Sequence, residues 1–181
     1  MQKLIRQHWW KALGVLILIY VFIAGMLIPL KPGITLVNPS STRTDTEVVV
    51  EVEGYNTNFD QAGESIRMWL KMDDERSIAA QQIEVLGPTK AKAAFRIPAY
   101  LPSQQKVQDF ALIIDNPVDG ATVRPNAVLV TQDSIDQELG EQQWKNDPLT
   151  NLHVRDGITF PFRNILGETI RNTYFHVSLW L

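Results

Sequence analysis

The chain has 181 residues, a formal net charge of −3 and a hydrophobic fraction of 45%, which suits one ordinary domain with attached segments. The small net charge and the lack of a Lys/Arg cluster exclude nucleic acid as the expected partner. With 0 cysteines, a disulfide framework, a zinc–thiolate site and a thiol nucleophile are also excluded.

The first predicted element is an uncharged stretch at residues 12–30, ALGVLILIYVFIAGMLIPL. As a helix it extends about 28 Å, close to the hydrocarbon thickness of a bilayer. The preceding segment, residues 1–11, carries the basic residues Lys3, Arg6 and Lys11. The positive-inside bias therefore predicts a cytoplasmic N-terminus and a transmembrane helix over residues 12–30.

The competing interpretation of this stretch is a cleaved signal peptide. Signal peptides usually have a shorter apolar core of about 7–15 residues and small side chains at the cleavage positions. Here Phe22 lies three positions before a cut after Ala24, where a small residue is expected. We favour an uncleaved anchor in the inner (plasma) membrane, and both interpretations place the rest of the chain on the extracytoplasmic, periplasmic side.

Residues 34–133 show the alternating apolar and polar pattern of short strands, separated by Gly, Pro and Asn-Pro breaks. Roughly six or seven strands over this length predict an extracytoplasmic all-β domain, an antiparallel Ig-like sandwich. The candidate strands are Thr46–Glu53, Ser65–Met72, Ala79–Leu86, Ala91–Ile97, Val107–Ile114 and Ala127–Thr131.

The start of this region resembles an IPT/TIG-type immunoglobulin-like module. The resemblance is carried by Ile34–Pro39, by Val48–Val50 and by Gly54-Tyr55-Asn56-Thr57-Asn58-Phe59. In such modules the G-x-N-x-x-F piece is a turn, in which Gly and Asn adopt left-handed backbone and Phe packs under the sheet. The resemblance implies a fold rather than an activity.

The middle of the chain contains no recognisable catalytic constellation, so an enzyme is not expected. The acidic run Asp73–Glu75 predicts a solvated turn, with a calcium site as the alternative. Trp69 lies on the opposite face of its strand from an apolar set of residues that is given below. We expect Trp69 to be a half-covered surface residue, with a ligand platform as the alternative. His153 predicts a loop or interface residue, because no second metal donor lies at suitable spacing. The apolar set comprises Ile66, Met68, Leu70 and Met72.

Residues 134–160 predict a connector. Its first part, Ser134–Trp144, has a helix start signal at Asp133/Ser134 and an acidic first turn, which predicts a short surface helix. Asn146-Asp147-Pro148 then breaks the chain.

Residues 161–181 predict an interfacial helix that begins at Arg163 and continues into a second membrane span. Polarity falls after Asn172 and no capping residue ends the helix, so we expect a longer membrane protein. His176 follows Arg171 by five residues, about 7–8 Å along the axis, which places its ring just inside the bilayer if Arg171 marks the headgroups. Ionisable residues at such positions are functional candidates.

Glu168, Asn172 and His176 share one helix face at fourfold spacing. We expect Asn172 to orient the imidazole of His176 by a hydrogen bond to the ring nitrogen not used for ligation.

The segment from Thr169 to Trp180, TIRNTYFHVSLW, resembles the first histidine segment of the heme-handling proteins of cytochrome c maturation, the CcmC/CcsA type. The resemblance implies that His176 is an axial heme-iron ligand and that Trp180 lies near the same pocket. Ser178 stands where the family usually has Pro. The family's second axial histidine and tryptophan-rich loop do not occur in this sequence, so we expect heme binding by this chain alone to be weak or absent.

Two functions follow from these patterns. In the first, the chain is part of a protein that delivers heme to a periplasmic heme chaperone or an apocytochrome c, beside other cytochrome c maturation proteins in the lipid membrane. In the second, the chain is a membrane-anchored Ig-like interaction or structural module without a cofactor.

Overall fold

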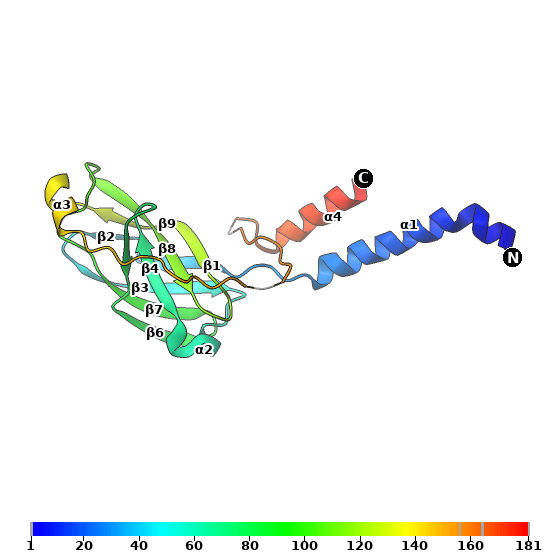
Figure 1. The fold of residues 1–181 in the computed structure, drawn as a ribbon, viewed down its shortest axis with the longest axis horizontal. Helices are drawn as coiled ribbons and strands as arrows, with labels where there is room; N and C mark the ends of the chain where they lie inside the picture. The colour runs from blue at the N-terminus through cyan, green and yellow to red at the C-terminus, as the bar shows by residue number, and fades with distance from the viewer. Residues whose placement is uncertain (1, 156, 164, 181) are drawn as a thin grey trace. The chain divides into compact units, whose positions relative to one another are not determined.

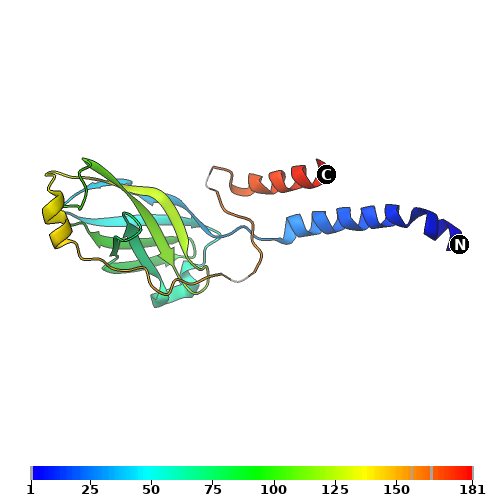
Figure 2. The same cartoon turned by 45° about the horizontal axis from the view of Figure 1, so that its top comes forward.

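The computed structural model describes residues 2–155, 157–163 and 165–180. The chain divides into two compact units. One unit is helical and combines residues 1–31 with residues 157–181. The other is a β unit formed by residues 32–156. Figures 1 and 2 show the two units in two views.

Helix α1 (Gln2–Leu27) opens the helical unit. Its part from His8 to Leu27 has a mean hydropathy of 2.1 and is long and apolar enough to cross a membrane, as an anchor or as a signal sequence. The helix ends at Leu27, before the end of the predicted span at residue 30. Pro29 explains the difference, because proline lacks an N–H and disfavours helical backbone at the residue before it.

The C-terminal helix is shorter than predicted. A 3₁₀ turn, η2 (Gly167–Thr169), precedes α4 (Ile170–Trp180). The predicted helix start at Arg163 is wrong, because Gly167 adopts a φ of 47° and the chain turns there. The amides of Leu166 and Gly167 both donate to the carbonyl of Arg163, which closes this turn.

The β unit contains two sheets. The four-stranded sheet has the order β1 (Gly33–Asn38), β3 (Glu47–Tyr55), β7 (Lys90–Arg96) and β6 (Gln82–Gly87). The five-stranded sheet has the order β2 (Ser41–Arg43), β9 (Thr122–Thr131), β8 (Val107–Asp115), β4 (Arg67–Lys71) and β5 (Ser77–Ala79). Neighbouring strands are antiparallel, except that β2 pairs with β9 in parallel. The prediction of a β-rich domain after an apolar helix is confirmed.

Three details of the predicted strands differ. The segment Ala79–Leu86 is not one strand: β5 ends at Ala79 in one sheet and β6 begins at Gln82 in the other. Ala80 and Gln81 connect the two sheets, and neither is a Gly or Pro that would indicate a break. Strands β1 and β2 were not among the candidates, and two short helices, α2 (Phe59–Ala62) and η1 (Gly63–Ser65), join β3 to β4.

Alternate residues of both sheets point into one shared hydrophobic core. Along β3, Val48, Val50 and Val52 are buried while their neighbours face outward. The predicted apolar face of the Ser65–Met72 segment is confirmed, because all four of its residues lie in this core or pack against it. The largest aromatic side chains in the core are Phe59, Phe95 and Phe110, each at most 1% exposed.

The predicted turn after β3 forms, for a partly different reason. Asn56 has a φ of 55° and Phe59 is buried, as expected. Gly54 is not in the left-handed region. A Cβ at Gly54 would instead lie 2.5 Å from the Thr57 hydroxyl, so this position needs glycine for space.

The connector helix α3 spans Gln137–Gln143. The predicted start at Asp133/Ser134 is wrong, because Asp136 is the capping residue. Its carboxylate accepts a hydrogen bond from the amide of Leu139 at 3.0 Å.

Candidate functional site

The histidine segment lies on α4, and α4 packs beside α1 within the helical unit (Figures 1 and 2). Arg171, in the first turn of α4, contacts Gly25 and Ile28 near the end of α1. One turn later on α4, Phe175 contacts Phe22, with ring centroids 6.0 Å apart. Because the partner on α1 moves backward as α4 advances, the two helices run antiparallel.

Gly25 makes this close packing possible. It is buried, and a Cβ there would lie 2.5 Å from Cζ of Phe175 and 2.9 Å from Cε1 of Tyr174. A larger side chain would push the aromatic rings away. Small residues that let a partner helix approach are typical of helix pairs in membranes.

Arg171 binds the end of α1. Its Nη1 donates to the carbonyl oxygens of Gly25 at 2.7 Å and Ile28 at 2.6 Å. Its Nε donates to Glu168 Oε2 at 2.7 Å, and its guanidinium carbon lies 5.6 Å from the ring centroid of Phe160. The last carbonyls of a helix have no partner within that helix, so Arg171 satisfies groups that α1 leaves open.

His176 is exposed, and no hydrogen bond to its ring is found within the described part of the chain. Asn172 is also exposed, and no hydrogen bond joins it to His176 among these residues, so its orienting role stays a prediction. Glu168, the third residue of the predicted polar face, pairs with Arg171 instead. The side chain of Trp180 lies outside the described residues.

A shallow apolar groove runs between the two helices close to this segment. It has a volume of about 360 Å³. Phe175, the residue before His176, forms one wall, and the rest comes from α1: Leu18, Ile19, Val21 and Phe22.

The other two histidines have different surroundings within their own units. His8 precedes Phe22, the partner of the histidine segment, by 14 residues, about 20 Å along α1. His153 lies in the β unit and is bound to Asp115. Within residues 2–155, 157–163 and 165–180, no group of three or more His, Cys, Asp or Glu side chains gathers in a way that could hold a metal ion.

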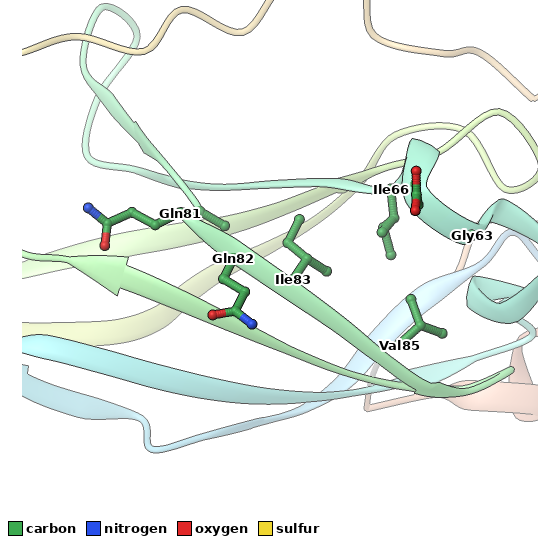
Figure 3. Close-up of a pocket in the computed structure, with 8 residues that line it drawn as sticks. Gly63, Ile66, Gln81, Gln82, Ile83 and Val85 are labelled. Atoms are coloured by element: carbon green, nitrogen blue, oxygen red, sulfur yellow. The ribbon is translucent and has the colours of Figure 1, made fainter.

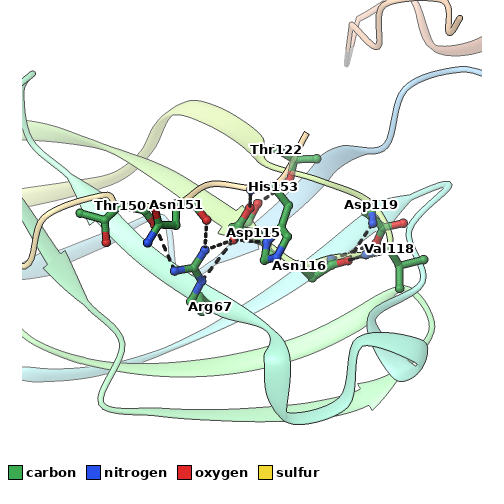
Figure 4. Close-up of polar contacts among 10 residues, drawn as sticks. Arg67, Asp115, Asn116, Val118, Asp119, Thr122, Thr150, Asn151 and His153 are labelled. Carbon is green, nitrogen blue, oxygen red and sulfur yellow. Dashed lines mark hydrogen bonds and ion pairs between the residues drawn. The ribbon is translucent and has the colours of Figure 1, made fainter. Parts of the chain in front are cut away.

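The β unit contains a polar cluster that the sequence did not indicate (Figure 4). At its centre is Asp115, which is fully buried. Its Oδ1 accepts from the amide of His153 at 2.7 Å, and its Oδ2 contacts His153 Nδ1 at 2.9 Å. The same Oδ2 accepts from Arg67 Nη2 at 2.5 Å and Nε at 3.2 Å.

These contacts set the charge state of Asp115. Burial raises the pKa of this carboxyl, but the hydrogen bonds from His153 and Arg67 lower the pKa more, so it lies below the ordinary value of 3.8. The ionised carboxylate is therefore the stable form in the folded β unit.

The cluster binds residues 146–155, a segment called the strap below, to the outer face of the five-stranded sheet. Arg67 also donates to the carbonyls of Thr150 at 3.1 Å and Asn151 at 2.6 Å. At the start of the strap, Asp147 binds the edge strand β5 through Ser77 and Ala79. An unpaired strand edge invites pairing with other chains, and the strap covers this one.

The strap explains why the prediction for Trp69 is wrong. Trp69 is 6% exposed rather than half-covered, although it does not belong to the shared core. It lies on the outer sheet face with Ile113, its partner on β8, and the guanidinium of Arg67 lies 5.2 Å from its ring centroid. The covering segment is about 80 residues away in sequence, so strand alternation cannot indicate it.

His153 therefore has a structural role at this point, in agreement with its predicted place in a loop. The acidic run Asp73–Glu75 forms a turn, in which the carboxylate of Asp73 accepts from the amides of Glu75 and Arg76. Asp74 is paired with Lys71 at 2.8 Å.

A hollow of the β unit lies beside the edge strand β6 (Figure 3). Its volume is about 450 Å³, and Glu64 is its single titratable lining residue among those described. It brings together no nucleophile and base. The other lining residues are Gly63, Ile66, Ala80, Gln81, Gln82, Ile83 and Val85.

Comparison of the chain with models of known protein families and with curated proteins finds no match.

Proposed function

We propose that this chain is part of a membrane protein that handles heme for cytochrome c maturation, with His176 as an axial ligand of the heme iron. Heme is the cargo, so the task is to hold it and pass it on rather than to make or break bonds. The receiving partner is a periplasmic heme chaperone or an apocytochrome c.

The observation that carries this proposal is the antiparallel helix pair. It turns α4 back along an apolar helix of membrane-spanning length while leaving His176 exposed. A continuation of α4 would run beside α1 as a second span. His176 then lies near the level of Phe22, inside the apolar stretch.

The residues present fit one half of a heme site. An imidazole with no other hydrogen-bond partner in the described residues has a ring nitrogen free for iron, and a neighbouring apolar groove suits a porphyrin. When bound, heme supplies the redox-active iron that the receiving cytochrome needs. We assign the second axial ligand to another residue of the full-length protein.

The β unit suits an insertion between two membrane helices, in the manner of an Ig-like module. The chain enters it at β1, where Gly33 pairs with Tyr55. The chain leaves the β unit along the strap, where Arg155 packs on Gly120. Asp119, the residue before Gly120, accepts hydrogen bonds from Asn58, which follows the end of β3 at Tyr55. Entry and exit therefore lie at one end of the sandwich, as an insertion requires, and we assign it a spacer or partner-docking role.

Cytochrome yield tests this function in cells that depend on the full-length protein. We expect His176→Ala to abolish c-type cytochrome production while the protein still reaches the membrane. His8→Ala, which removes an exposed histidine at the far end of α1, serves as the matched control and should leave the yield unchanged. Normal yield with His176→Ala would contradict the ligand assignment.

The alternative is a membrane-anchored Ig-like module without a cofactor. It is favoured by the self-contained construction of the β unit, in which Asp115, Asn116, Asp119 and Gln132 are buried with partners inside the unit. In that case a version with an unrelated single-span anchor in place of α1 and α4 would keep full function. The heme proposal predicts complete loss of function for that exchange.

A further inference from the structure

Arg171 precedes His176 by five residues and has several contacts that a role in binding heme would not require. Among the described residues, the contacts of Arg171 are all internal to the helical unit: two carbonyls at the end of α1, the carboxylate of Glu168 and the ring of Phe160. Its side chain is 19% exposed. The guanidinium is thus already occupied and largely shielded.

The contacts with α1 fix the position of α4 along that helix. Gly25 and Ile28 are separated by about 4.5 Å of helical rise, and one guanidinium nitrogen binds both of their carbonyls. A slide of α4 by one residue would break at least one of these short bonds. The packing of Phe175 on Gly25 adds a second, apolar constraint in the same register.

Three physical effects strengthen the hydrogen bonds from Arg171 to the end of α1. The free carbonyls at the C-terminal end of a helix carry partial negative charge, which a cation stabilises. In a lipid environment these carbonyls lack water, so a charged donor is worth more there than at an aqueous surface. An isolated helix of the length of α4 is only marginally stable, so α4 depends on such contacts.

We propose that Arg171 is the positioning residue of the candidate heme site: by capping the end of α1 it sets the register of α4 and so the height of His176 along α1. His176 lies about 7.5 Å along the helix axis from Arg171, a fixed distance once the helix is formed. The register of the helix pair therefore determines where the imidazole lies. The part of this inference that concerns heme rests on the proposed function.

The register is measured without heme by electron–electron distance spectroscopy on spin labels. The natural chain has 0 cysteines, so Leu16→Cys and Val177→Cys give two labels and no background. Both positions are exposed, at 66% and 57%, and lie on the two helices outside the packed contacts. With Arg171 present, in lipid nanodiscs, we expect one narrow distance distribution.

Arg171→Ala should shift or broaden this distribution, and Arg171→Lys should restore it in part, because lysine donates to carbonyls but lacks the planar fork that also reaches Glu168. Arg163→Ala is the matched control, since Arg163 is exposed and its side chain has no hydrogen bond in the described residues. Tryptophan fluorescence of the β unit verifies that each variant is folded. An unchanged distribution for Arg171→Ala would overturn the inference.

A heme measurement on the full-length protein separates positioning from direct binding of the heme carboxylates. We expect Arg171→Ala to weaken the binding of hemin and of uncharged heme dimethyl ester by the same factor. Weakening for hemin alone would overturn the inference, because it would make Arg171 a carboxylate ligand. If instead His176→Ala leaves hemin binding unchanged, the proposed function fails while the spin-label distances still decide the role of Arg171 in the helix pair.

Discussion

The two units of the chain treat their apolar side chains in opposite ways. In the β unit, Phe95 and Phe110 are completely buried between the sheets. On α1, Leu16 and Leu27 are 66% and 76% exposed, and most of the other apolar residues of this helix are exposed as well. A β unit built in this way is stable in water, whereas a continuous exposed apolar surface needs lipid or a partner.

Polar groups show the same contrast. The β unit buries the carboxylate of Asp115 and surrounds it with donors from two segments of the chain, Arg67 on β4 and His153 in the strap. In the helical unit the shielded cation of Arg171 caps carbonyls, while the exposed imidazole of His176 has no hydrogen-bond partner among the described residues. The buried polar residues of the β unit therefore stabilise its fold, whereas the exposed His176 has no such structural role among the described residues.

The largest expected effect is on the core of the β unit. Phe110→Ala removes a fully buried ring and should lower the free energy of unfolding by about 4 kcal/mol, through lost burial and the cavity left behind. Urea unfolding followed by tryptophan fluorescence measures this loss. Leu16→Ala on α1 is the control and should leave this transition unchanged. Equal effects of the two substitutions would remove the distinction between the units.

The next effect concerns the strap. Asp115→Ala leaves Arg67 and the amide of His153 without their acceptor and should cost about 3 kcal/mol of unfolding free energy. The same unfolding experiment measures it. Asp133→Ala removes an exposed carboxylate, 3.6 Å from Arg43, and should change stability by less than about 1 kcal/mol. Equal losses of unfolding free energy in Asp115→Ala and Asp133→Ala would show that Asp115 does not hold the strap on the sheet.

Sequence patterns predicted the β unit in outline because strand alternation is a local signal. The inward face of the Ser65–Met72 segment was predicted residue by residue. The burial of Trp69 was not, because the strap that covers it comes from a distant part of the chain. The Asp115 cluster was not predicted either, because its partners Arg67 and His153 are far apart in sequence.

The helical unit was predicted less well at its boundaries. The apolar span was evident, yet the start of α4 depends on the left-handed turn at Gly167, which a helical pattern does not indicate. Nor does the sequence indicate that Arg171 faces α1 rather than the bilayer headgroups. A glycine in an apolar helix, such as Gly25, is a signal for close helix packing that could have suggested this partner.

The two glycines of α1 sharpen the contrast within the helical unit. Gly25→Val should separate α4 from α1, since a side chain there overlaps Phe175, at a cost of about 1–3 kcal/mol to the helix pair. Gly14→Val is the control, because nothing lies within 4 Å of a Cβ at Gly14. Spin-label distances between the helices measure the effect, while the unfolding of the β unit should be unchanged in both variants. Intact pairing in Gly25→Val would contradict the described packing.

The smallest effect near neutral pH is that of protonation. The pKa of Asp115 is lower in the folded protein than in the unfolded chain, so its ionised form contributes stability above the unfolded pKa of about 4. This contribution is lost as the pH falls below about 4 and through the folded pKa. The free energy of unfolding should therefore decrease with acid in that range, and Asp115→Asn should flatten the decrease. The same slope in both proteins would show that another group titrates.

The central claim is that His176 binds heme iron, and hemin titration of the purified full-length protein in lipid nanodiscs tests it most directly. We expect the Soret band of the bound heme to shift and its affinity to fall in His176→Ala, with no change in His8→Ala. A Soret band and an affinity that are the same in all three proteins would contradict the account.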